Sequence, residues 1–249
     1  MSKTKIEWAD YTINPIVGCT KISSGCKNCY GEKMAWRLKC MGIPKYQDVV
    51  DENGWTGKIG FDFSCSDKIP RALKSPKRIF IGSMGDTFHP NVPTETIKNV
   101  LKATLHTYFL HHTFMFLTKR PERMAEIIKK DWGPWLGVTV EHPDYLWRID
   151  ELLKIPAAVR FISVEPMLAP VEFDQFWGAL GVGIDWVVIG CESGPRRRSI
   201  PIKYIEDLVA QCDDAGVPVF VKQAEIDSKL VKMPEILGRT WAQFPGEQL

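Results

Sequence analysis

The segment 160–222 decides the fold, because it contains the runs RFISVE (160–165), WVVIG (186–190) and PVFVK (218–222). Each run is short and almost wholly apolar, and residues 202–215 between the last two have the spacing of an amphipathic helix. Near-continuous apolar strands that alternate with helices are typical of a parallel sheet covered on both faces. The segment therefore predicts an α/β fold.

The same rhythm extends toward the amino terminus. We expect further strands at 61–65, 78–83, 113–118 and 135–140, and an early strand near 6–12. We expect further helices at 28–39, 66–73, 94–110, 121–130, 143–153 and 173–179. The total of about eight strands predicts a parallel (βα) barrel, TIM-barrel-like, full or partial, in a single domain over 1–249.

Two stretches interrupt the rhythm. The stretch at about 41–60 contains Pro44, Gly54 and Gly57, and indicates a surface insertion. The tail at about 224–249 is expected to wrap the barrel or to close its opening.

Composition narrows the class of protein. The net charge of +2, from 32 basic and 30 acidic residues, is too balanced for a protein that grips duplex DNA by electrostatics alone. No apolar run approaches the ~18 residues of a membrane-spanning helix, and the amino terminus lacks a secretory signal. We therefore expect a cytoplasmic location and no membrane partner. Seven cysteines, an odd number, then favour metal-binding or catalytic roles over disulfides.

Polar and ionisable residues follow the end of nearly every predicted strand. They are Ser83, Asp86, Thr118, Lys119, Arg120, Glu141, Glu165, Glu192, Lys222 and Gln223. Enzymes with parallel barrels build their active sites from residues at these carboxyl ends. The sequence therefore predicts a site at this end of the barrel.

Three cysteines gather in one loop, Cys19-Thr-Lys-Ile-Ser-Ser-Gly-Cys26-Lys-Asn-Cys29. Thiolates are soft ligands that suit an iron–sulfur cluster or zinc. Structural zinc normally has four ligands, whereas Cys40 lies a helix length away and the nearest histidine is His89. Three ligands on a 4Fe-4S cluster leave one iron open for a cofactor or substrate. Zinc with a distant fourth ligand and three ordinary buried cysteines are the alternatives.

The order of a strand, a three-cysteine loop, a helix and a run of βα units resembles the radical S-adenosylmethionine (radical SAM) superfamily. The resemblance implies that the open iron binds the amino and carboxylate groups of S-adenosyl-L-methionine. Reductive cleavage then yields a 5′-deoxyadenosyl radical that removes a hydrogen from the substrate, and an electron donor protein is needed. The usual spacing there is Cys-x3-Cys-x2-Cys, whereas the first gap here is six residues.

The whole chain more closely resembles a family of phage and prophage proteins with a three-cysteine motif. The resemblance rests on Ile6-Glu7-Trp8, Gly18-Cys19, Gly25-Cys26-Lys27-Asn28-Cys29-Tyr30, Ser83-Met84-Gly85-Asp86-Thr87-Phe88-His89, Leu117-Thr118-Lys119-Arg120-Pro121, Ser163-Val164-Glu165-Pro166 and Glu192-Ser193-Gly194-Pro195. This chain has Cys191 where that family usually has glycine. Cys191 either adds a ligand or fills space.

Carboxylates at the strand ends are candidates for binding the cofactor. Glu165, Glu192 and Ser193 are expected to contact its ribose hydroxyls or its ammonium group, because a carboxylate accepts charge-assisted hydrogen bonds. An ion pair with a neighbouring lysine or arginine is the alternative for either glutamate. Trp8 either stacks on a base or belongs to the core.

Two basic clusters predict an anionic substrate, a nucleotide or nucleic acid. Lys119 with Arg120, and Arg196 with Arg198, are expected to bind phosphate, the guanidinium groups bidentately. A solvated basic loop is the alternative for the second cluster.

Asp86, His89 and Lys222 are candidate catalytic residues. Asp86 and His89 follow the strand at 78–83 and would act as acid–base partners or bind the substrate. A structural histidine and a buried salt bridge at Lys222 are the alternatives.

The leading hypothesis is therefore an iron–sulfur enzyme that cleaves S-adenosyl-L-methionine and modifies a nucleotide or nucleic acid. One alternative is a binding or structural protein that holds zinc or a non-catalytic cluster. Another is an iron–sulfur nucleic-acid repair enzyme that does not use S-adenosyl-L-methionine.

Overall fold

The structure is a computed structural model that describes residues 2–65, 75–105, 111–130, 133–177 and 183–246. The predicted helix at 66–73 lies outside the described residues, as do the ends of the predicted helices at 94–110 and 173–179.

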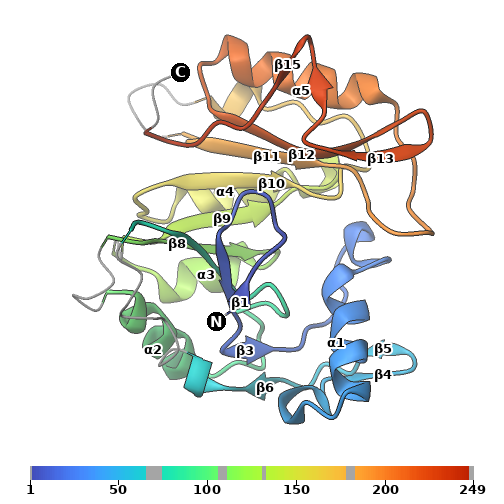
Figure 1. The fold of residues 1–249 in the computed structure, drawn as a ribbon. Helices are drawn as coiled ribbons and strands as arrows, with labels where there is room; N and C mark the ends of the chain where they lie inside the picture. Colours follow the sequence, from blue (N-terminus) through green and yellow to red (C-terminus); the bar gives the residue numbers. More distant parts are fainter. Residues whose placement is uncertain (1, 66–74, 106–110, 131–132, 178–182, 247–249) are drawn as a thin grey trace.

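A nine-stranded sheet forms the centre of the molecule, in the order β1-β2-β7-β8-β9-β10-β11-β12-β13 (Figure 1). The strands from β2 to β12 are parallel, and β1 and β13 pair antiparallel at the two edges. Their bounds are β1 Ser2–Lys3, β2 Tyr11–Ile13, β7 Arg78–Ile81, β8 Thr113–Thr118, β9 Trp135–Thr139, β10 Arg160–Val164, β11 Trp186–Gly190, β12 Val219–Ile226 and β13 Lys229–Lys232. The fold is thus mixed α/β with a mostly parallel sheet.

The sheet is open, and a closed TIM-like barrel is not formed by the described residues. The prediction of a strand at Phe61–Cys65 is wrong. The absence of this strand from the large sheet explains part of the difference between the open sheet and the predicted barrel. Only Phe61 belongs to a strand, β6 (Gly60–Phe61), which pairs with β3 (Ile16–Val17) in a separate small sheet. The chain then turns at η3 (Phe63–Cys65), so that β2 and β7 pair directly.

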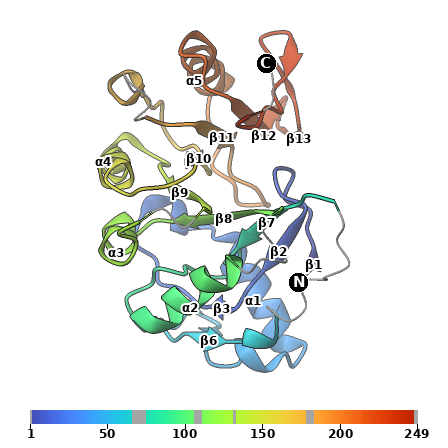
Figure 2. The same ribbon diagram turned by 90° about the vertical axis from the view of Figure 1, so that its left-hand side faces the viewer.

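Four helices cover the convex face of this sheet, which curves like an open C (Figure 2). They are α2 Thr94–Thr104, α3 Pro121–Ile127, α4 Trp147–Leu153 and α5 Ile202–Asp214. Every second residue of the strands points to this face and joins one large core with the helices, for example Phe116, Val138, Ile162, Ile189, Leu101, Ile149 and Leu208. This burial holds the carboxyl ends of the strands in register.

The concave face is layered from the amino to the carboxyl ends of the strands. The first layer is aromatic and buried, with Trp8, Phe80, Phe161, Trp186, Phe220 and Phe244. The strands alternate, so Leu117, Thr139, Ser163, Val188 and Gly190 are inward positions closer to the carboxyl ends. The charged residues Lys119, Glu141, Glu165, Glu192 and Lys222 lie at the carboxyl side of these positions or level with the last of them. Charge therefore collects at the carboxyl ends of the strands, which we call the mouth.

Trp8 belongs to the aromatic layer. Its ring centroid lies 4.9 Å from that of Phe80 and 6.1 Å from that of Trp186. The side chain is 2% exposed, which agrees with the core alternative rather than with stacking on a base.

The insertion at 41–60 is not a bare surface loop. It contains η2 (Pro44–Tyr46), β4 (Val50–Asp51) and β5 (Gly54–Trp55) beside α1 (Tyr30–Cys40). A small separate core joins the two segments, formed by Val17, Ala35, Tyr46, Val49, Val50 and Met84. This core anchors α1, the helix that follows the cysteines.

The tail wraps the sheet rather than closing the mouth. After β13 it forms β14 (Glu235–Ile236) and β15 (Arg239–Thr240), and then runs antiparallel to the start of β12. Phe244 covers the aromatic layer there. Among the described residues, no helix is long and apolar enough to cross a membrane.

Candidate functional site

The cysteine loop, residues 19–29, lies at the mouth and leads into α1. Its start requires glycine, because Gly18 has a φ of +100° and a Cβ there would lie 2.3 Å from the carbonyl oxygen of Lys58. Cys19, Cys26 and Cys29 are all free and half-buried. Side chains from β8, β9 and β11 hold this loop at three points.

Glu141, directly beyond the β9 segment, makes the first contact. Its Oε1 accepts hydrogen bonds from Lys119 Nζ at 2.7 Å and from the backbone N–H of Gly25 at 3.2 Å, and also contacts the Ser23 hydroxyl. Its Oε2 accepts a bond of 2.9 Å from Arg148 Nη1. Glu141 is fully buried. Burial opposes its charge, but Lys119, Ser23 and Arg148 together outweigh burial and the pKa of Glu141 is lowered.

Arg120, after β8, makes the second contact, at the start of the loop. Its Nη1 donates to Asp86 Oδ2 at 2.7 Å and lies 3.7 Å from Cys19 Sγ. Its Nη2 donates to Thr20 Oγ1 at 2.7 Å and to the Thr20 carbonyl at 3.2 Å. Asp86 also accepts a bond of 2.7 Å from Thr118. This buried pair fixes the Cys19 end of the loop.

His89 also contacts the Cys19 end of the cysteine loop. Its Nδ1 accepts the backbone N–H of Asn91 at 3.1 Å, so Nε2 carries the proton and donates to Thr20 Oγ1 at 3.0 Å. Burial, with the nearby Arg120, lowers the pKa of His89. The residue is 1% exposed and neutral, and both ring nitrogens are engaged.

Glu192, after β11, makes the third contact. Its Oε2 accepts bonds from Asn28 Nδ2 at 2.9 Å and from Arg198 Nε at 3.0 Å. Arg198 also donates to the Ser24 carbonyl at 3.0 Å. Burial opposes the charge of Glu192, but the hydrogen bonds from Arg198 and Asn28 outweigh it and lower its pKa. This pair therefore holds the loop next to Cys26 and Cys29.

The three thiols have different surroundings. Burial raises the pKa of Cys19 to about 12, with Asp86 adding to the effect. Burial also opposes ionisation of Cys26, but Lys119, a hydrogen bond with Ser23 and the backbone of Ile22 and Ser23 together outweigh it, and the pKa of Cys26 is lowered. Among the described residues, no three His, Cys, Asp or Glu side chains converge closely enough to hold one metal ion.

This spacing does not conflict with a cluster. A zinc ion needs its ligands to converge on one point, whereas each thiolate of a cubane binds a different iron atom. The donors also suit an anionic group, because the Arg120 and Lys119 cations lie next to Cys19 and Cys26. The residues present therefore fit a 4Fe-4S cluster.

Glu165 and Lys222 form a separate pair at the mouth. Lys222 Nζ lies 2.9 Å from Glu165 Oε1, while Oε2 accepts from Trp8 Nε1 at 3.2 Å and from Ser163 Oγ at 3.3 Å. Burial opposes the charge of Lys222, but Glu165 and more distant groups outweigh it and raise its pKa. Within the described part of the chain, this pair forms no hydrogen bond or ion pair with the cysteine loop.

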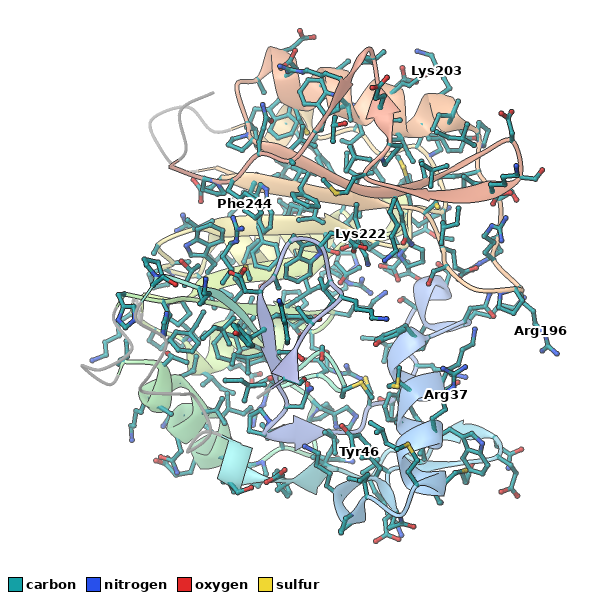
Figure 3. All side chains as sticks on the ribbon, in the orientation of Figure 1. Arg37, Tyr46, Arg196, Lys203, Lys222 and Phe244 are labelled. Atoms are coloured by element: carbon teal, nitrogen blue, oxygen red, sulfur yellow. The ribbon has the colours of Figure 1, made fainter. Side chains whose placement is uncertain are left out.

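The remaining predicted site residues take different positions. Ser193 is half-buried beside Glu192. Arg196 is exposed, and its side chain extends outward at the edge of the molecule (Figure 3). Cys191 is buried, and burial raises the pKa of its thiol to about 11. Its thiol thus stays protonated beneath the mouth.

The structure thus brings Asp86, His89, Lys119, Arg120, Glu192 and Arg198 together around the cysteine loop. Sequence reasoning assigned them to catalysis, cofactor binding and substrate binding, and it placed Glu141 only as one strand-end residue among others. Polarity after a strand marked Glu141, but the sequence of α4 gave no sign that Arg148 would be its partner. Nor did it show that Asn28 would reach Glu192.

The fold and the loop define an α/β protein with a three-cysteine site at the carboxyl ends of an open, mostly parallel sheet. Residues 3–245 match the family described as "Protein of unknown function (DUF5131)", and the chain belongs to that family. No curated protein and no solved structure matched the chain. The family match carries no statement about phage origin or radical SAM chemistry.

Proposed function

We propose that the protein is an iron–sulfur enzyme of the radical SAM type that acts on a nucleotide or nucleic acid. The observation that carries the proposal is the way the cysteine loop is held. Three ion pairs with buried carboxylates, Lys119–Glu141, Arg120–Asp86 and Arg198–Glu192, fix a loop whose three thiols remain free and half-buried. Ordinary packing cysteines have no need of such support.

In this proposal Cys19, Cys26 and Cys29 bind the cluster. Arg120 and Lys119, with their partners Asp86 and Glu141, keep the loop in place together with Glu192 and His89. When bound, the cluster would supply one electron to S-adenosyl-L-methionine from an electron donor protein. Such a cluster needs a reducing compartment, so the proposal places the protein in the cytoplasm.

Glu165 and Lys222 are the residues we assign to the cofactor. They lie at the mouth, and their contacts do not hold the loop. Glu165 can accept hydrogen bonds from an ammonium or from ribose hydroxyls, and Lys222 can face a carboxylate. The partial-barrel form of the radical SAM fold would accommodate an open sheet of this kind.

The residues that can bind the substrate's phosphate differ from those expected from the sequence. Lys119, Arg120 and Arg198 were expected to bind phosphate, but their charges are balanced by Glu141, Asp86 and Glu192. They serve the substrate only by positioning the loop. Arg196 keeps its free charge at the edge of the mouth.

The test is anaerobic purification followed by reduction in the presence of S-adenosyl-L-methionine. We expect about four irons and four sulfides per chain, as in one cubane, and formation of 5′-deoxyadenosine. Stoichiometric zinc without sulfide would contradict the proposal and favour a structural protein. A cluster with no cleavage of the cofactor would favour the repair enzyme that does not use it.

A further inference from the structure

The exposed face of α1 is basic and aromatic. Its exposed residues are Tyr30, Lys33, Trp36, Arg37 and Cys40, and none of them is acidic. At 100° per residue they occupy one continuous side of the helix, with Lys33 at its centre and Arg37 between Lys33 and Tyr30. The opposite side is buried through Gly31 and Ala35.

The cations of α1 differ from those of the other surface helices. In α2, Lys98 and Lys102 both lie within 4 Å of Glu95, and in α5 Lys203 pairs with Asp207. In the described structure, Lys33 and Arg37 have no such partner.

The single acid of α1, Glu32, is turned away from this face. It pairs with Lys21 at 2.9 Å and accepts the backbone N–H of Trp55 at 3.0 Å. Two like charges four residues apart destabilise a helix. Lys33 and Arg37 therefore repel each other, and the described residues show no acidic partner that would offset this repulsion, which favours a role in binding.

The basic surface continues from α1 to the loop after β11. Asn28 Nδ2 donates to the carbonyl of Arg196 at 3.0 Å, which brings the backbone at Arg196 to the end of the cysteine loop that contains Lys27. Lys33 Nζ lies beside Gly194, 3.6 Å from the position of a Cβ there. Arg37 and Arg196 lie on the same side of the molecule (Figure 3). We call Lys27, Lys33, Arg37 and Arg196 the basic track.

Two exposed aromatic rings lie along the basic track. Tyr30 is 56% exposed and Trp36 is 38% exposed. Tyr30 directly follows Cys29, the last residue of the cysteine loop at the mouth. Cations next to exposed aromatic rings are the combination that binds unpaired nucleotides, because the cations contact the backbone and the rings stack on the bases.

We propose that the basic track and its two rings bind single-stranded nucleic acid and lead it to the mouth. The inference deepens the proposed function, since it names a polymer as the substrate class. Lys33 and Arg37 are separated by about 6 Å along the helix, and together with Lys27 and Arg196 they follow the backbone. An acidic protein would match the charges but would make little use of the rings.

The experiment measures binding of a labelled 12-nucleotide single strand by fluorescence anisotropy, using the full-length protein without S-adenosyl-L-methionine. We expect the double variant Lys33→Ala/Arg37→Ala to bind at least tenfold more weakly. Its dependence of log K on log salt should be shallower by about 1.4, since each lost phosphate contact removes about 0.7. The matched control is Lys98→Ala/Lys102→Ala, which removes the same charge with the same spacing and should change neither quantity.

The rings have a matched control of their own. Trp36→Leu should weaken binding at least fivefold, whereas Trp147→Leu, which removes an equally exposed ring from α4, should not. Equal losses in variants and controls would overturn the proposal. So would tighter binding of the duplex, or equal binding of poly-glutamate, which would indicate an acidic protein partner. DNA and RNA strands are measured separately, and either one supports the proposal.

Binding does not depend on the cleavage assay, so the two proposals can fail separately. If the protein binds the strand but yields no 5′-deoxyadenosine, the proposed role of the basic track stands and the proposed reaction is contradicted. If the protein yields 5′-deoxyadenosine without binding any strand, the proposed reaction stands and the proposed role of the basic track is contradicted.

Discussion

Glu141 and Glu165 occupy equivalent places in the fold and do different work. Each is the inward residue just beyond the end of its strand, β9 or β10, and each faces a lysine from another strand. Glu141 also accepts hydrogen bonds from Ser23, Gly25 and Arg148. It is completely buried and anchors the cysteine loop. The partners of Glu165 are Lys222, Trp8 and Ser163. Position on the sheet places a carboxylate at the mouth, and the segment that packs over it decides its role.

The different roles of Glu141 and Glu165 presuppose that the cysteine loop holds a 4Fe-4S cluster. Replacing Cys19, Cys26 or Cys29 singly by Ala should remove most of the iron from anaerobically purified protein, because each thiolate binds a separate iron. Iron and sulfide analysis provides the measurement. Cys40→Ala and Cys212→Ala are the controls and should keep the full iron content. Full retention of iron in the three loop variants would remove the premise.

The sharpest test of the difference is Glu141→Gln. This change leaves Lys119 and Arg148 without their shared carboxylate, and breaking a buried ion pair typically costs about 3–5 kcal/mol. We expect the free energy of unfolding to fall by that order and the iron content to fall with it. Denaturant titration and iron analysis check the two effects. Should the variant keep both its stability and its iron, Glu141 would not be an anchor.

The counterpart is Glu165→Gln, alone and combined with Lys222→Met. Since this pair does not hold the loop, iron should be retained in full. Affinity for S-adenosyl-L-methionine should drop by about tenfold or more, as expected for a lost charge-assisted hydrogen bond of roughly 1.5–3 kcal/mol. Calorimetry on the loaded protein measures this. Loss of iron in Glu165→Gln would mean that both carboxylates are anchors.

A smaller effect is expected at Gly25, where the loop meets the anchor. A Cβ there would lie 2.8 Å from both Glu141 Oε1 and Lys119 Nζ. Gly25→Ala should therefore cost about 1–3 kcal/mol of stability, as overpacking does. Ser24→Ala is the neighbouring control and leaves that contact free. Equal stability of the two variants would show that the loop can shift away from Glu141.

The smallest effect is expected at Cys191, which lies just before Glu192. Its buried, protonated thiol fills space below the mouth. Cys191→Ala should keep all the iron and cost about 1 kcal/mol, the scale of a small truncation in the core. A fall in iron would instead make Cys191 a ligand.

Much of the sheet could be predicted because its strands are apolar runs of clear length. Thr113–Thr118 and Trp186–Gly190 have the predicted bounds, and α1, α3 and α5 begin within two residues of their predicted starts. Phe61–Cys65 misled the prediction, because its alternating FDFSC pattern resembles a strand while the chain turns at Phe63. Closure of a barrel depends on which segments pair, and local periodicity carries no information about pairing.

The site shows the same limit. Strand-end polarity placed charged residues at the mouth, but it did not show which of them would neutralise each other. Lys119 pairs with Glu141 because the fold brings the ends of the neighbouring strands β8 and β9 together, and Arg198 pairs with Glu192 because the segment after β11 turns back on itself. Their assignment to phosphate binding assumed free charges. Only the contacts of the described residues showed that the charges of Arg196, Lys33 and Arg37 have no ion-pair partner.

The aromatic layer has a consequence for the order of events in turnover. Trp8, Trp186 and Phe244 are buried and fill the concave face behind the mouth. A molecule cannot reach the thiols through this layer, so it has to approach from the carboxyl side. Reductant, cofactor and a long substrate would then use one opening. Under the proposed function, a bound strand would therefore slow the delivery of the electron to the cysteine loop.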